Sequence, residues 1–110
     1  MRLLEKEFEG KGEVSGTMFK QLDKTDKAFF YELTDIESGK KRYEVFERML
    51  QEKETIVING AEVNLEEREL YPRSNAFGVW AWCISDYNKA KAKFVELNKQ
   101  LNNENQIKRN

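Results

Sequence analysis

The sequence predicts an α+β fold, an antiparallel β-sheet of four to five strands that includes a long hairpin, with a C-terminal α-helix packed on one face. Runs rich in β-branched and aromatic residues recur between residues 17 and 84, an Asn-Gly pair separates two of them, and an amphipathic helical pattern follows. With 110 residues, 39% of them hydrophobic, the chain is expected to form a single α+β domain over residues 1–101 and a frayed tail over residues 102–110.

The first strands are predicted over residues 17–22, 28–34 and 42–50. The polar DIESGK stretch after residue 34 has the composition of a turn, so the second and third strands are expected to form a hairpin. Side chains alternate between the two faces of a strand. One face of the second strand should therefore carry Phe29, Tyr31 and Leu33, and the other Ala28, Phe30 and Glu32.

The segment TIVINGAEVNL predicts a tight hairpin. Asn59-Gly60 suits a type I′ turn, which places Ile58 opposite Ala61 and Ile56 opposite Val63. Continued along the chain, this register joins residues 42–58 and 61–71 into one long hairpin whose outer half projects from the sheet. It also places Glu52 opposite Glu67, and because opposed like charges are unfavourable, we expect a break or bulge there.

The last strand is predicted over residues 77–84, FGVWAWCI, and the helix follows it. Ser85 suits the N-cap, and Asp86 suits the positive end of the helix dipole. Helical spacing then places five residues in one apolar stripe, Tyr87, Ala90, Phe94, Leu97 and Leu101.

Both faces of the predicted last strand are apolar. One carries Phe77, Val79, Ala81 and Cys83, and the other Gly78, Trp80, Trp82 and Ile84. Small side chains favour the Phe77 side as the one that the helix covers. For the other side two interpretations stay open: it is covered by the N-terminal segment, with Leu3, Leu4 and Phe8, or by the long hairpin, or else the tryptophans are accessible as a dimer seam or docking surface.

The composition argues against an enzyme. The chain has no histidine, so no Ser-His-Asp or Cys-His pair can form, and its single cysteine, Cys83, excludes an internal disulfide and a multi-cysteine zinc site. The GKGEVSG stretch matches no phosphate-binding loop. We therefore expect no catalytic residues, metal or cofactor. Without a signal-peptide pattern or an apolar spanning run, a cytoplasmic location without membrane contact is expected.

Two groups of residues are predicted to contact a partner. The first group, around the aromatic strand, is Trp80, Trp82, Tyr71 and Arg73. For Arg73, an internal salt bridge to the acidic hairpin is the favoured alternative. The second is an acidic surface, because residues 43–70 carry a net charge of −5 whereas residues 71–110 carry +4. Its members are Glu62, Glu66, Glu67 and Glu69.

The stretch YPRSNAFGVWAWC, with the upstream FKQLDKTDKAFFYELTD and KRYEVFER, resembles a group of small proteins from phages and mobile elements of gut-type bacteria. The resemblance spans roughly residues 14–98, and TIVINGAEVNL looks like an insertion relative to shorter members. It implies a phage or mobile-element setting, in which small binders that modulate a host protein are expected. It implies no particular activity.

The leading hypothesis is thus a small non-enzymatic protein-interaction module, as a monomer or a homodimer. An alternative is a single-stranded nucleic-acid-binding protein that stacks bases on its aromatic residues, with a basic helix and Arg73 near the phosphates. The net charge of −1 makes that alternative weaker. A third is a small-ligand pocket between sheet and helix.

Overall fold

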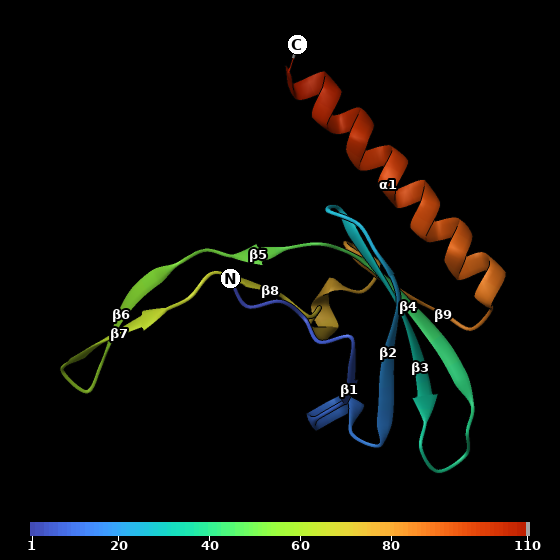
Figure 1. Ribbon diagram of the computed structural model, residues 1–110, viewed down its shortest axis with the longest axis horizontal. Helices are drawn as coiled ribbons and strands as arrows, with labels where there is room; N and C mark the ends of the chain where they lie inside the picture. The colour runs from blue at the N-terminus through green and yellow to red at the C-terminus, as the bar shows by residue number, and fades with distance from the viewer. Residues whose placement is uncertain (110) are drawn as a thin grey trace.

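The main body of the protein is a five-stranded antiparallel sheet with one helix on it (Figure 1), which confirms the α+β prediction. The computed structural model describes the backbone of residues 1–109 and the side chains of residues 1–101. In spatial order the strands are β1 (Glu7–Glu9), β2 (Thr17–Lys24), β3 (Ala28–Asp35), β4 (Lys41–Glu47) and β9 (Ala81–Ile84). The helix is α1 (Tyr87–Arg109), and two short 3-10 turns are η1 (Gly12–Val14) and η2 (Ser74–Ala76).

One face of the sheet is covered by α1. The predicted stripe on the helix is confirmed, since Ala90, Phe94 and Leu97 are buried against Phe30 and Val45 of the sheet. Asp86, rather than the predicted Ser85, caps the helix, because its Oδ2 accepts the backbone N–H of Lys89 at 2.9 Å. The predicted fraying of residues 102–110 lies outside the residues whose side chains the structure describes.

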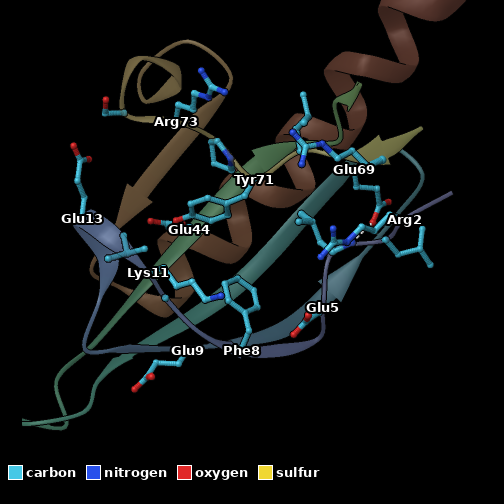
Figure 2. A pocket seen from close by; sticks show the side chains of 18 of the residues that line it. Arg2, Glu5, Phe8, Glu9, Lys11, Glu13, Glu44, Glu69, Tyr71 and Arg73 are labelled. Atoms are coloured by element: carbon cyan, nitrogen blue, oxygen red, sulfur yellow. Dashed lines mark hydrogen bonds between the residues drawn. The ribbon is translucent and has the colours of Figure 1, made fainter. Parts of the chain in front are cut away.

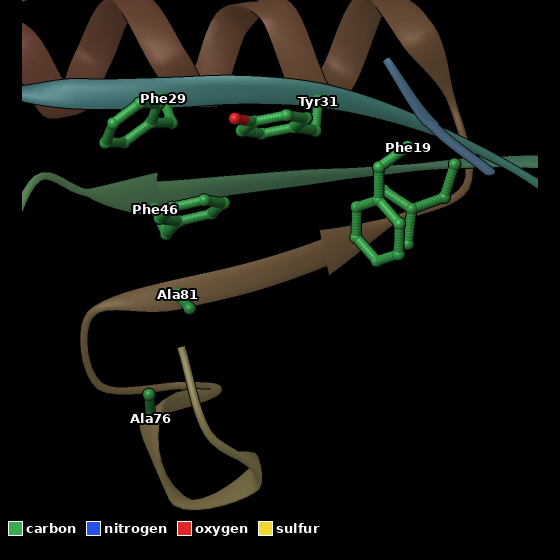
Figure 3. Packing of buried hydrophobic residues seen from close by; sticks show 7 residues of the cluster. Phe19, Phe29, Tyr31, Phe46, Ala76 and Ala81 are labelled. Carbon is green, nitrogen blue, oxygen red and sulfur yellow. The ribbon is translucent and has the colours of Figure 1, made fainter. Parts of the chain in front are cut away.

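The opposite face is covered by the chain itself. Phe29, Tyr31 and Leu33 of β3 are fully buried there, in a cluster with Phe19 and Phe46 (Figure 3). Aromatic rings dominate the cluster; those of Tyr31 and Phe46 stack at 5.7 Å. The half-buried side chains packed against it come from the N-terminal segment and from the loop before β9: Leu4, Phe8, Val14, Tyr71, Phe77 and Trp80. The face away from the helix is therefore covered by the N-terminal segment together with the loop before β9.

The predicted strand over residues 77–84 is wrong in its first half. Only Ala81–Ile84 pair with β4, and the residues before them form a tight turn in which Gly78 has φ 87° and donates its N–H to the carbonyl of Ala81 at 2.7 Å. Phe77 and Ala81 pack on the side away from α1, whereas Trp82 packs beneath the helix; the turn places Trp80 on the Phe77 side. The predicted covering of the Phe77 side by the helix is thus reversed.

A long two-stranded arm leaves the sheet between β4 and the loop before β9. Its root pairs β5 (Leu50–Gln51) with β8 (Arg68–Glu69), and its distal part pairs β6 (Glu54–Ile58) with β7 (Ala61–Leu65). Figure 1 shows the distal part lying well away from the main sheet. The turn and the register are as predicted: Asn59 and Gly60 have positive φ, and Ile58 lies opposite Ala61. The predicted break also occurs, around Glu52 and Glu67.

A buried carboxylate fastens the root of the arm to the sheet and to the N-terminal segment. The side chain of Glu69 has no exposed surface, and it accepts hydrogen bonds from the Leu4 backbone N–H at 2.9 Å, from Lys24 and from the Arg48 guanidinium. Backbone hydrogen bonds between Arg2 and the root strand add to this junction. Burial alone would raise the pKa of Glu69, but these donors hold it below the ordinary value.

Replacing this carboxylate should strongly destabilise the fold. Glu69→Gln leaves the Arg48 and Lys24 charges without an anion, and we expect a loss of about 2–4 kcal/mol in the free energy of unfolding at neutral pH. Urea denaturation measures it, with Glu67→Gln as the matched control because Glu67 makes only a backbone contact to Arg2.

The same pair of variants tests whether the charge of Glu69 causes this loss of stability. A lowered folded-state pKa stabilises the protein above the unfolded-state pKa, and this stabilisation is lost as the pH falls through the folded-state value. The difference between wild type and Glu69→Gln should therefore shrink on acidification. If the stability difference between wild type and Glu69→Gln did not change with pH, the ionised Glu69 carboxylate would not be its cause.

Candidate binding surfaces

The two tryptophans do not form one common surface. Trp80 is half-buried against the aromatic cluster, and Trp82 is half-buried on the opposite face of the sheet beneath α1. The Lys93 ammonium lies 4.1 Å from the centre of the Trp82 ring, in a cation–π contact. A docking patch built on both indoles is therefore not what the fold presents.

Tyr71 and Arg73, the other two residues of that predicted group, line a groove on the face of the sheet away from the helix. The groove has a volume of about 1260 Å³ and runs between the N-terminal segment and the residues from β8 to Phe77 (Figure 2). Its walls also include Phe8, Lys11 and Val14. Arg73 is exposed, and no salt bridge to it is found among the described residues, so the internal ion pair favoured from the sequence does not form.

Glu44 of β4 lies at the floor of this groove. It is only 3% exposed, it lies beside Tyr31 of β3 and Cys83 of β9 in the sheet register, and its Oε1 accepts a hydrogen bond from the Tyr71 hydroxyl at 2.5 Å. Figure 2 shows the Tyr71 ring reaching across the groove to this carboxylate. The interaction joins the loop before β9 to the centre of the sheet.

The surroundings of Glu44 make its ionised form more costly than it is in water. Burial raises the pKa of the Glu44 carboxyl, and the Tyr71 hydrogen bond and the nearby Arg42 charge offset the rise only in part. Burial, followed by the negative charge of Glu44, also raises the pKa of Tyr71. Tyr71 is therefore a neutral donor throughout the physiological pH range.

The predicted acidic surface is only partly realised. Glu62 and Glu66 are exposed on the arm and Glu67 is half-buried, but Glu69 is buried inside the junction described above. Glu69 was wrongly predicted as a surface residue, because its alternation with charged neighbours resembles a solvated strand. The distal arm and its flanks, residues 52–67, still carry a net charge of −4.

The distal arm presents an apolar face that was not singled out from the sequence. The strand register places five apolar residues on one side of the ribbon: Ile56, Ile58, Ala61, Val63 and Leu65. Val57 on the reverse side is 69% exposed, and Ile58 is 50% exposed. In the part of the chain described, β6 and β7 pair only with each other, and Figure 1 shows the ribbon well away from the main sheet and from α1.

Side chains for covalent or metal chemistry are not gathered in these surfaces. Burial and the charge of Glu44 raise the pKa of the Cys83 thiol, which keeps it in its less nucleophilic form. Within the described residues, no three acidic or cysteine side chains are placed to hold a metal ion. The groove can therefore bind through charge, hydrogen bonds and aromatic contact.

No protein-family model, curated protein or solved structure matches this chain. In the part that the structure describes, no helix combines the length and the apolar character needed to cross a membrane.

Removing the charge at the floor of the groove should stabilise the protein at neutral pH. A raised folded-state pKa gives stability that is complete below the unfolded-state pKa and is lost as the pH rises through the folded-state value. Glu44→Gln keeps an acceptor for Tyr71 and should gain roughly 1 kcal/mol at neutral pH, because no ion has to be desolvated.

Urea denaturation at acidic and at neutral pH measures this gain. It should vanish at acidic pH, where wild type carries a protonated Glu44. The exposed Glu7, which does not line the groove, provides the matched Glu7→Gln control, for which we expect no change at either pH. Destabilisation by Glu44→Gln at neutral pH would show that the carboxylate is well compensated.

Proposed function

We propose that the protein is a non-enzymatic protein-interaction module whose primary contact surface is the apolar face of the distal arm. One observation supports this most directly: at the end of a long two-stranded projection Ile58 is 50% exposed, and Ile56, Val63 and Leu65 on the same face are only partly buried. A two-stranded hairpin is at best marginally stable in water without a third strand or a covering layer. Exposed apolar area of this kind commonly marks an interaction site.

The charge around the arm favours a partner with a basic surface. Five acidic residues and one lysine lie in residues 52–67, so a positively charged rim on the partner would speed the encounter and help select it. Given the resemblance to phage and mobile-element proteins, we propose a cytoplasmic host protein as the partner, which the module would bind and modulate. A second copy of the chain is the other candidate for this surface.

The arm can be tested with a matched pair of isoleucine variants. Ile58 is 50% exposed at the tip of the arm, and Ile36 is 51% exposed in the turn after β3. We expect Ile58→Ser to weaken partner binding about tenfold or more, as for an interface hot spot, while Ile36→Ser leaves it unchanged. The partner is captured from a lysate of the native host, identified by mass spectrometry, purified and titrated against each variant.

Two further readouts make this test decisive. Binding should weaken as salt is raised, because the acidic rim acts through screened charge. Light scattering at high concentration, before and after Ile58→Ser, shows whether the partner is a second copy. Capture that is insensitive to both Ile58→Ser and salt would contradict a role for the arm.

A further inference from the structure

Two buried glutamates line the groove, and they differ in the hydrogen-bond donors around them. Glu69, at one end, is surrounded by two cationic side chains and one backbone N–H. Glu44, at the floor, is buried as deeply but has one hydrogen-bond donor among the described residues, the neutral Tyr71 hydroxyl. A buried carboxylate with so little compensation carries a desolvation cost that the fold itself does not require.

The charged and titratable groups around Glu44 do not remove this cost. Arg42 on the same strand acts on the carboxylate through its field without hydrogen-bonding to it. Lys11 and Arg73 line the groove, and neither forms an ion pair with Glu44 among the described residues. Arg2 and Arg68 also line the groove without an ion pair to Glu44 among the described residues, and the neutral or acidic groups nearest to it are Tyr31, Tyr71, Cys83 and Glu13.

We infer that the groove binds an arginine side chain of a partner polypeptide, with its guanidinium paired to the Glu44 carboxylate. A planar guanidinium donates two parallel hydrogen bonds to a carboxylate and also packs on aromatic rings. The groove offers both features, since Phe8, Tyr71 and Glu44 all line it and the rings of Phe8 and Tyr71 lie 6.4 Å apart, edge to face. An ammonium group would pair with the carboxylate charge, but it has no planar surface to pack on these rings.

The dimensions and rim of the groove fit a polypeptide better than a free ion. Its volume of about 1260 Å³ exceeds that of one side chain, and its rim carries both signs of charge, for example Glu9 and Arg73. The mixed charges at the rim therefore give little preference for the net charge of a ligand, whereas the Glu44 carboxyl at the floor favours a cation. This site lies apart from the distal part of the arm, β6 and β7, so it can be tested independently of the proposed function.

An NMR titration with a defined probe tests the inference. The probe is N-acetyl-arginine methylamide, compared with the matching lysine and norleucine derivatives. We expect binding on the order of millimolar, as is usual for so small a ligand, with shifts concentrated at Phe8, Glu44 and Tyr71. The arginine probe should also lower the pKa of Glu44, read from its side-chain carboxyl carbon, because a bound cation favours the ionised form.

Variants show whether the arginine probe binds at Glu44 or is attracted to acidic surfaces in general. Glu44→Gln should weaken arginine binding about tenfold, since it removes a charge-assisted pair, whereas the exposed Glu7→Gln should leave the affinity unchanged. Equal binding of the lysine probe, or shifts scattered over surface carboxylates that persist in Glu44→Gln, would overturn the inference. So would a rise in the pKa of Glu44 on Lys11→Gln alone, which would show that the chain's own ammonium already fills the site.

Discussion

The architecture depends on one buried ion cluster, in which Glu69 joins three parts of the chain that are distant in sequence. Its partners are the backbone of Leu4, the end of β2 at Lys24 and the residue after β4, Arg48. This cluster ties Leu4 to the sheet, and the pairing of β1 with β2 then places Phe8 opposite Phe19, where the two rings stack at 4.5 Å. A sheet that is apolar on both faces can therefore be covered with only one helix, and the second cover is irregular chain.

The same junction explains why a groove exists on this face. A helix would fill the space over the sheet evenly, but the N-terminal segment and the residues from β8 onward meet near Glu69, where Arg2 and Leu4 contact the arm root, and at the aromatic cluster. Between them a groove stays open above Glu44, whose own side chain is buried. Both glutamates line the groove. Glu69 is a buried charge paired by several donors, whereas Glu44 is a buried carboxyl with one donor among the described residues. Proteins commonly retain such a cost where a site serves binding.

The sequence was sufficient for the regular elements because each carries a local signal. Alternation in AFFYELT placed Phe29 and Phe30 on their observed faces, and Asn59-Gly60 fixed the turn and the register of the arm. The turn at Gly78 was missed because FGVWAWCI reads as a continuous strand, and only the backbone hydrogen bonds around Ala76 show that its first half folds back. The face assigned to the helix was wrong for a different reason, since α1 packs over Trp82 rather than over the small side chain of Ala81.

The functional residues were harder to predict for a physical reason. Glu44 lies in KRYEVFER, where a single glutamate between aromatic residues looks like an ordinary solvated position of a strand with one exposed face. Its burial arises from Tyr71, which is 27 residues away along the chain, and from the N-terminal segment. The same applies to Glu69, whose ion partners come from the end of β2 and from the residue after β4. Long-range pairing of charges leaves no periodic signal in a sequence.

The break in the arm has a consequence for how its apolar face meets a partner. The pairs on both sides of the break keep one register, since Leu50 lies opposite Glu69 and Glu54 lies opposite Leu65. The break is therefore a loss of ladder pairing without an inserted residue, at the point where Glu52 and Glu67 would face each other. Such a break lets the ribbon bend while its side chains keep their faces. The root, fixed through Glu69, then limits the region the tip can reach, so the arm can adapt its angle to a partner while Ile56, Ile58 and Val63 stay together.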